Sequence, residues 1–199
     1  MNKIKYSFFA LISRMKYITR WSLMRNSTVE NIGEHSHMVA VIAHALAVIR
    51  NDVFGKKIDA GAVVSIAIFH DSSEIFTGDL PTPVKYFDPS IMAAYKKVEA
   101  VAARKLLTAL PSEMRPAYKK ILSPDTQSEV FSLVKAADKL AAYIKCVEEV
   151  KSGNLEFRQA ADECRRKLDM PDIPEVAYFI DNFMPAFELT LDELNFSIE

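Results

Sequence analysis

The feature that most constrains the fold is an apolar repeat at helical spacing that runs along nearly the whole chain. It is clearest between Ser128 and Val150, where five apolar side chains fall on one side of a helix: Val130, Val134, Ala137, Ala141 and Ile144. Only five glycines occur in 199 residues, and the turn signals typical of β proteins are sparse. We therefore predict an all-α fold, a single-domain helical bundle over residues 1–199.

Start and stop signals place some of these helices. Asn31 followed three residues later by Glu34 resembles a capping box, so a long helix is predicted to begin there. Another is predicted from near Asp59. The segment 77–87 is predicted to be irregular, because Gly78 and two prolines interrupt helices. The same periodicity predicts further helices over about residues 4–18, 90–109, 126–152, 154–168 and 173–189.

Composition narrows the compartment and the partners. The formal charge is -1, so no basic field is present to hold a nucleic-acid backbone, and we expect no nucleic-acid partner. Cys146 and Cys164 form no CxxC pair and suit a reducing cytosol. The N-terminal apolar stretch is broken by Arg14 and Lys16, which favours an amphipathic helix over a signal peptide. No stretch approaches the roughly 20 apolar residues that cross a bilayer. We expect a cytoplasmic protein with no membrane segment.

Four polar side chains occur on faces that should be apolar. His35 opens the apolar stripe of the second helix, and His70 and Asp71 end the very apolar VVSIAIFHDSSEIF. Asp138 lies within the core stripe of VKAADKLAAY. A carboxylate on such a face is costly unless it is paired or binds a cation.

Each of these residues also has a structural interpretation. His35 can form a local hydrogen bond at a helix start. His70 and Asp71 can be a solvated helix end, and Asp138 can form a salt bridge with Lys135 or Lys139.

Taken together, two imidazoles and two carboxylates from three separate helices predict a metal site in the bundle core. Mixed nitrogen and oxygen ligands suit one divalent transition metal, namely Co, Mn, Fe, Ni or Zn, better than Ca or Mg. Such a ligand set leaves positions open for water and substrate, as catalysis requires.

Two acidic residues near this motif are candidates for proton transfer. Glu74 follows His70 by four residues and would share its helical face, where a carboxylate can accept a proton from a metal-bound water. Asp79 in the Gly-Asp-Leu-Pro loop is a candidate second acid near the leaving group. The alternatives are a solvated Glu74 and a purely turn-forming Asp79.

Arg20 and Trp21 are candidates for substrate binding. The planar fork of Arg20 matches phosphate oxygens, and Trp21, the only tryptophan, suits a sugar or a base. The alternatives are a solvated arginine and a core tryptophan. Lys85 can add positive charge near the loop. His37 and His44, one heptad apart on another face, are interpreted as structural or solvent-facing.

The order His35, His70-Asp71, Asp138 resembles the HD-domain metal-dependent phosphohydrolase superfamily. Within it, the chain is similar to the bacterial 5′-deoxynucleotidases over nearly its whole length. The resemblance rests on three runs: RWSLMRNSTVENIGEHS (20–36), FHDSSEIFTGDLPTPVKYF (69–87) and SLVKAADKLAAYIKCVEEV (132–150). The second run is the most specific, and the C-terminal third the least.

This resemblance implies an HD-type helical bundle, commonly a homodimer, with one divalent metal bound by His35, His70, Asp71 and Asp138. It implies that a metal-activated water hydrolyses a 2′-deoxyribonucleoside 5′-monophosphate to the deoxynucleoside and phosphate. The remaining implied roles are catalysis by Glu74, phosphate binding by Arg20 and definition of the nucleotide site by Trp21 and Asp79.

Two other functions are compatible with the same residues. One is a phosphodiesterase or pyrophosphohydrolase of signalling nucleotides, although a single His-Asp motif in a short chain argues against a two-metal diesterase. The other is a catalytically silent sensing or binding module, which would be expected to have lost part of the ligand set. Base preference and the identity of the metal do not follow from the sequence.

Overall fold

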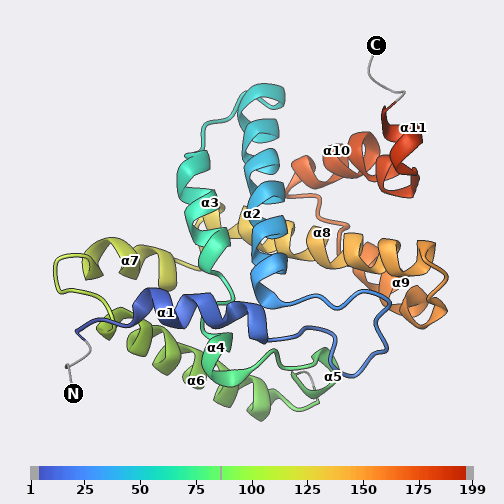
Figure 1. The fold of residues 1–199 in the computed structure, drawn as a ribbon. Coiled ribbons are helices and arrows are strands. Elements are labelled where there is room, and N and C mark those ends of the chain that lie inside the picture. Colours follow the sequence, from blue (N-terminus) through green and yellow to red (C-terminus); the bar gives the residue numbers. More distant parts are fainter. Residues whose placement is uncertain (1–4, 86, 196–199) are drawn as a thin grey trace.

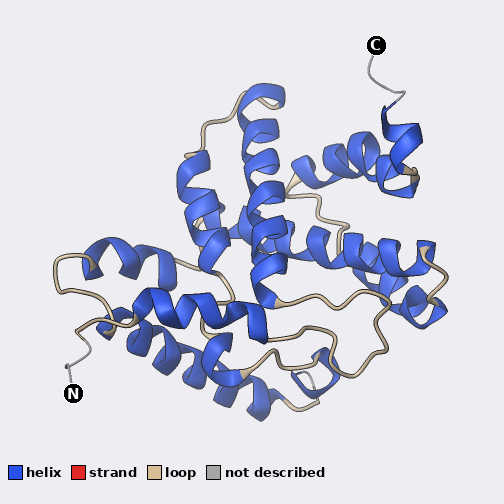
Figure 2. Cartoon of the chain, in the orientation of Figure 1, coloured by secondary structure: helices blue, strands red, loops and turns tan. Residues whose placement is uncertain are grey.

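The computed structural model describes residues 5–85 and 87–195, and within them the chain is helical and contains no strand (Figure 2). An isolated antiparallel bridge joins Thr19 to Asn31. The all-α prediction is confirmed.

The α-helices, in chain order, are α1 (Phe8–Ile12), α2 (Ile32–Val48), α3 (Ala60–Phe69), α4 (Glu74–Thr77), α5 (Thr82–Lys85), α6 (Pro89–Thr108), α7 (Arg115–Leu122), α8 (Glu129–Lys151), α9 (Arg158–Arg166), α10 (Pro174–Phe183) and α11 (Leu191–Asn195). A π-turn extends α2 (Ile49–Val53), and 3-10 turns follow α1 (Ser13–Tyr17), precede α9 (Leu155–Phe157) and follow α10 (Met184–Glu188).

The core is built where α2 packs against α3 and α8 (Figure 1). Ala43 and Ala47 of α2 and Ala137 of α8 are fully buried, and such small side chains let helix backbones approach closely. Leu46 and Leu140 fill the space beside them. Full burial of one such leucine stabilises the fold by about 1.5–3 kcal/mol.

A second apolar cluster joins α1 to the α6–α7 pair. Phe8 is almost completely buried against Leu106 and Leu110, and its ring lies 4.9 Å from Tyr118 and 6.1 Å from Phe69. Because Phe69 is the last residue of α3, this cluster holds the end of α3 and the turn that follows it.

The capping signals are confirmed. The Asn31 side chain accepts hydrogen bonds from the backbone N–H groups of Gly33 and Glu34, and Glu34 accepts one from the Asn31 N–H, which completes a capping box. Asp59 caps α3 by accepting from the N–H of Ala62.

Other boundaries differ from the prediction. The helix expected over 4–18 begins at a residue outside the described part; α1 is only five residues long, and a 3-10 turn follows it. The segment 77–87, of which residue 86 lies outside the described part, contains α5, because a proline in a first turn loses no helical hydrogen bond. α7 and α11 were not predicted.

The expectation that no stretch is apolar enough to span a bilayer needs correction. Residues Ile32–Val53 form a helix that is long and apolar enough by length and composition. More than half of its most apolar window is buried inside the fold, between α3 and α8, as in the central core helix of many proteins. It is therefore weak evidence for a membrane segment.

Candidate active site

His35 lies in the first turn of α2, which the capping box fixes. Its side chain is completely buried, and Nε2 lies 3.1 Å from Oδ1 of Asp138 and 3.7 Å from Oδ2 of Asp71. Its other ring nitrogen, Nδ1, lies 2.9 Å from Nη1 of Arg20. These side-chain partners all come from other parts of the chain, so the local hydrogen bond considered as an alternative is not what the ring forms.

His70 and Asp71 occupy the turn after α3. Nδ1 of His70 lies 2.8 Å from the carbonyl oxygen of Ala67; this contact requires a proton on Nδ1, so in the neutral ring the lone pair is on Nε2. That Nε2 is buried without a hydrogen-bond partner and lies 3.1 Å from Oδ2 of Asp71. The His70 side chain is 3% exposed, which contradicts a solvated helix end.

Asp138 projects from the middle of α8 at the edge of the core. Its Oδ1 faces both histidines, 3.1 Å from Nε2 of His35 and 3.9 Å from Nε2 of His70. Its Oδ2 accepts a hydrogen bond from Nζ of Lys135 at 3.2 Å. The salt bridge considered as an alternative is therefore present beside the histidine contacts, and does not replace them.

The electrostatics of this cluster favour a cation. Burial alone would lower the pKa of His70, but Asp71 and Asp138 raise it above its ordinary value. Burial would raise the pKa of both aspartates, yet the imidazoles of His70 and His35, with Lys135 beside Asp138, hold both well below the usual range. Positive charge at the centre of this group is therefore stabilised by both carboxylates.

The donor geometry fits a metal ion. One ligating atom each from His35, His70 and Asp138 lie within 4.8 Å of one another, and Asp71 lies against both imidazoles. The buried, unpartnered Nε2 of His70 is the kind of atom that a metal satisfies. Two nitrogens and carboxylate oxygens match the ligand preferences of the divalent transition metals. Their role as metal ligands stays a prediction.

Glu74 does not share a helical face with His70 as expected, because α3 ends at Phe69 and Glu74 begins the separate α4. It is nevertheless 8% exposed, and its Oε2 has no hydrogen-bond partner. Burial, with Asp71 and Asp79 nearby, raises the pKa of Glu74 to about 10. The alternative of a solvated glutamate is wrong.

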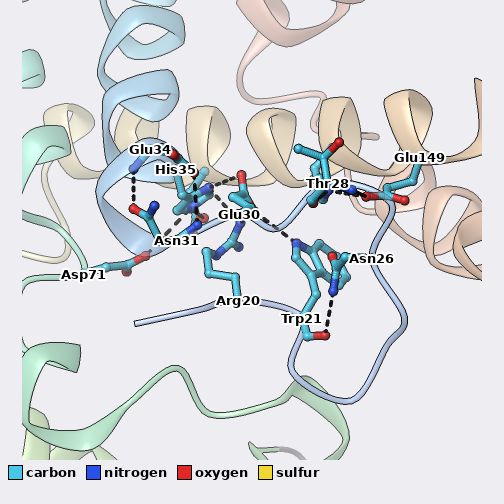
Figure 3. A network of polar contacts seen from close by, with 12 residues as sticks. Arg20, Trp21, Asn26, Thr28, Glu30, Asn31, Glu34, His35, Asp71 and Glu149 are labelled. Carbon is cyan, nitrogen blue, oxygen red and sulfur yellow. Dashed lines mark hydrogen bonds and ion pairs between the residues drawn. The ribbon is translucent and has the colours of Figure 1, made fainter. Parts of the chain in front are cut away.

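Arg20 and Trp21 begin a loop that runs from Thr19 to Asn31, and an antiparallel bridge between these two residues joins its ends. The Arg20 N–H donates to the Glu30 carbonyl oxygen at 2.9 Å. The same glutamate accepts with Oε2 from Nη1 of Arg20 at 2.5 Å and from the indole Nε1 of Trp21 at 3.2 Å (Figure 3). Burial alone would lower the pKa of Arg20, but Glu30 and the aspartates raise it, so the guanidinium stays charged.

Trp21 is only partly buried. Its ring centroid lies 5.3 Å from that of Phe157, and one edge is held by Glu30. Both interpretations from the sequence therefore apply in part, since the indole packs against Phe157 and the residue is still partly exposed.

Asp79 and Lys85 lie near this group to different degrees. Burial raises the pKa of Asp79, an effect that Arg20 and a hydrogen bond from the Trp21 backbone N–H partly offset. Asp79 therefore lies close to both Arg20 and Trp21. Lys85 lies with Nζ 5.3 Å from the Tyr95 ring centroid, and its charge lowers the pKa of Glu74. Contact of Lys85 with a substrate stays a prediction.

Comparison with known proteins identifies the family. The family model described as 5′-deoxynucleotidase YfbR-like matches residues 7–187. The chain belongs to this family. It is 49% identical over 189 residues to a 5′-deoxynucleotidase of Vibrio vulnificus, a match covering 94% of this chain and 97% of that one. The predicted resemblance is confirmed, and the chain is a hydrolase of the 5′-deoxynucleotidase family.

Solved structures agree with this YfbR-like family in fold. An HD-domain phosphohydrolase from Listeria innocua superposes with a TM-score of 0.80 at 23% identity, over 96% of both chains. A cyanophage S-2L HD phosphohydrolase bound to dA and one catalytic Zn²⁺ ion superposes with a TM-score of 0.56 at 22% identity, covering 92% of this chain and 96% of that one. At these identities the likeness shows the HD-type helical fold.

Two residues beside the site of this YfbR-like chain were not predicted. Glu30 has no sequence signal, because glutamate before a helix cap is ordinarily solvated. Tyr95 of α6 contacts the loop that contains Asp79, with its hydroxyl 3.1 Å from Oγ1 of Thr77 and 3.2 Å from the carbonyl oxygen of Gly78. His37 and His44 are exposed, as one of the two interpretations had them.

A cavity of about 590 Å³ lies elsewhere, between the C-terminal end of α8 and α11. It is lined by Glu148, which is ten residues along α8 from Asp138, and by Phe187 and Leu189. It contains none of the candidate site residues.

Proposed function

We propose that this member of the YfbR-like family hydrolyses 2′-deoxyribonucleoside 5′-monophosphates to the deoxynucleoside and phosphate. The observation that supports this most directly is the convergence of the His-Asp cluster with Arg20 and Trp21 on one side of the N-terminus of α2. Curated relatives about half identical over nearly the whole chain are named 5′-deoxynucleotidases.

His35, His70, Asp71 and Asp138 would hold one divalent transition metal, for which Co, Mn, Fe, Ni and Zn remain the candidates. The Zn²⁺ ion in the similar cyanophage phosphohydrolase supports a metal of this class. When bound, such a metal supplies a Lewis acid that polarises a phosphoryl oxygen and makes a neighbouring water more acidic.

Glu74 would accept the proton of the attacking water, because its buried Oε2 has no hydrogen-bond partner among the described residues and its carboxyl group lies near Asp71. Burial and the carboxylates of Asp71 and Asp79 keep its pKa high, an effect that Arg20 and Lys85 only partly offset. A cation beside Asp71 would lower that pKa and favour the ionised form that a base requires.

Arg20 would bind the phosphate through a planar, permanently charged fork, which positions the phosphoryl group and stabilises its charge. Asp79, whose pKa burial raises, lies close to Arg20 and Trp21 and would supply a proton to the departing 5′ oxygen. The accessible side of Trp21 would pack against the deoxyribose and leave no room for a 2′-hydroxyl, and Lys85 would add positive charge near Glu74.

The experiment that tests this function is phosphate release from dAMP, dGMP, dCMP, dTMP, dUMP and AMP by metal-stripped protein, before and after addition of Co²⁺, Mn²⁺, Zn²⁺ or Mg²⁺. We expect metal-dependent release from the deoxynucleotides, with AMP spared. Turnover of AMP at the dAMP rate would refute the sugar selectivity. Absence of release from all six would refute the nucleotidase activity and direct the search to diester and pyrophosphate substrates.

We also infer a single domain over residues 1–199, a cytoplasmic location and a homodimer without a nucleic-acid partner. The exposed face of α2 supports the dimer, because Val41 and Val48 lie one heptad apart on it and are 52% and 37% exposed. Sedimentation of the wild type and of Val41→Glu tests this; a monomeric wild type would refute it.

A further inference from the structure

We propose that Glu30 is a positioning residue, whose carboxylate holds Arg20 and Trp21 in the arrangement that binds the nucleotide. The inference rests on the proposed function, and it assigns a role to a residue of the loop between Thr19 and Asn31 that does not itself face the substrate as a ligand.

One oxygen of Glu30 serves both neighbours. Oε2 accepts from Nη1 of Arg20 at 2.5 Å and from Nε1 of Trp21 at 3.2 Å. The side chains of Glu30 and Arg20 are 15% and 13% exposed, so the ion pair is largely removed from water, where a charge-assisted hydrogen bond is strong. A single acceptor therefore fixes the guanidinium and the indole relative to each other (Figure 3).

The contact leaves the rest of the arginine fork available. Nη1 contacts Glu30 and lies 2.9 Å from Nδ1 of His35, whereas among the described residues no hydrogen bond involves Nε or Nη2 of Arg20. Arginine frequently binds a phosphate through two parallel N–H donors of one guanidinium. Glu30 thus engages only Nη1, the nitrogen that also contacts His35. It holds the guanidinium in place while Nε and Nη2 remain free to bind an anion.

Trp21 has a backbone that needs such support. Its φ is 59°, in the left-handed region, which is unfavourable for a bulky side chain. The indole is held by Glu30 at Nε1 and by the ring of Phe157, 5.3 Å away. Without Glu30, the indole Nε1 would lose the only hydrogen bond that it forms among the described residues.

The two ends of the loop are held in place without the Glu30 side chain. Its neck is closed by backbone hydrogen bonds, from Arg20 N–H to the Glu30 carbonyl oxygen and from Ile32 N–H to the Ile18 carbonyl oxygen, both 2.9 Å. Its far end is fixed by Glu149, which accepts from the N–H groups of Ser27 and Thr28. Removing the Glu30 carboxylate should therefore release two side chains without unfolding the loop.

The test compares Glu30→Gln with Glu34→Gln. Glu34 is exposed and lies four residues after Glu30. Its side chain accepts a hydrogen bond from the backbone N–H of Asn31 in the capping box, and glutamine can do the same. The first readout is steady-state kinetics with dAMP in the metal-loaded protein. The second is acrylamide quenching of the only tryptophan in the metal-free protein, which reports on Trp21 independently of activity.

We expect Glu30→Gln to lower kcat/KM for dAMP about 10- to 100-fold, as for loss of one charge-assisted hydrogen bond, and to make Trp21 more accessible to acrylamide. Glu34→Gln should match the wild type in both. In an Arg20→Ala background, Glu30→Gln should change kcat/KM by less than about threefold, because the groups act together.

Three outcomes would overturn the inference: unchanged kinetics and quenching in Glu30→Gln; a lower KM, which would make Glu30 a competitor of the phosphate; or full additivity with Arg20→Ala. If Glu30→Gln fails to fold, Glu30→Asp keeps the charge but shortens the reach, and wild-type behaviour of that variant would equally refute it. A wild type inactive on deoxynucleotides would refute the proposed function instead, and quenching alone would then decide the role of Glu30.

Discussion

The carboxylate of Glu149 provides a test of how the loop between Thr19 and Asn31 is attached to the core. Glu149 is 1% exposed on α8 and accepts hydrogen bonds from the backbone N–H groups of Ser27 at 2.8 Å and Thr28 at 3.1 Å. Asn154 and Lys145 donate to the same carboxylate, and Lys145 also donates to the Thr28 carbonyl oxygen. Substitution by glutamine removes the charge and one acceptor oxygen while keeping the size.

The expected magnitude follows from the pKa of this group. Burial alone would raise the pKa of Glu149, but the hydrogen bonds from Lys145, Asn154 and the two backbone amides outweigh burial and lower it from 4.5 to about 2. At about 1.4 kcal/mol for each tenfold change, this corresponds to about 3 kcal/mol of stability. Because the folded pKa is the lower one, this stability is present above pH 4.5 and is lost as the pH falls toward 2.

The assay is urea unfolding followed by circular dichroism, on the wild type, Glu149→Gln and the exposed neighbour Glu148→Gln. At pH 7 we expect Glu149→Gln to lose about 2–4 kcal/mol, since the ammonium of Lys145 also loses its charged partner. Glu148→Gln should stay within about 0.5 kcal/mol of the wild type. At pH 3 the deficit of Glu149→Gln should shrink to about half, because the wild type has itself begun to lose the contribution.

The result that would refute this reasoning is a Glu149→Gln protein as stable as Glu148→Gln at pH 7. A deficit that is the same at pH 7 and pH 3 would also refute it, because the loss would then come from packing and not from the ionised carboxylate.

Three substitutions test the candidate active site. Asp138→Asn should weaken Zn²⁺ binding, measured by calorimetry, by more than the roughly 10- to 100-fold typical of changes outside the ligand shell. Glu74→Gln should lower kcat about 10²- to 10⁴-fold in the phosphate-release assay. The same change should stabilise the metal-free protein at pH 8, since a folded pKa of about 10 makes ionisation above pH 4.5 favour the unfolded chain. Trp21→Phe should reduce the preference for dAMP over AMP, measured as the ratio of their kcat/KM values.

Each of these has a distinct contradicting result. Undiminished Zn²⁺ affinity in Asp138→Asn would remove this aspartate from the ligand set. Near wild-type kcat in Glu74→Gln would exclude it as the base, and a less stable metal-free protein would contradict its raised pKa. An unchanged dAMP preference in Trp21→Phe would move sugar selection to other residues.

Much of the helical core could be predicted, because the signals for it are local. The periodicity between Ser128 and Val150 corresponds to α8, and the capping box at Asn31 marks the first turn of α2 to the residue. Local signals were less informative where tertiary contacts decide. Phe8 leads a short α1 that packs on α6 and α7, and the missed α7 is amphipathic with little apolar surface of its own.

The polar cluster could be predicted because its members occur at sequence positions where apolar residues are expected. His70 and Asp138 interrupt apolar stripes, where an unpaired polar group is costly, so their chemistry shows in the sequence. Glu74 was placed near the site for a wrong reason, since the turn at His70 ends the helix. Glu149 gave no signal, because its partner Ser27 is 122 residues away and only the fold buries its carboxylate. Glu30 gave none, because only the fold of its loop brings the carboxylate to Arg20 and Trp21.

Trp21 is the position where local preference and the fold disagree most. A left-handed backbone at a bulky residue costs about 1–2 kcal/mol, and among the described residues it is the only non-glycine with positive φ. The contacts that outweigh this cost are spread over the loop: Asn26 donates to the Trp21 carbonyl oxygen, Glu30 accepts from the indole and Phe157 packs on the ring. This conformation directs the indole to the same carboxylate oxygen that orients Arg20. Relaxing the backbone would separate the two side chains, so we infer that the strain is retained because it keeps the groups for the sugar and the phosphate together.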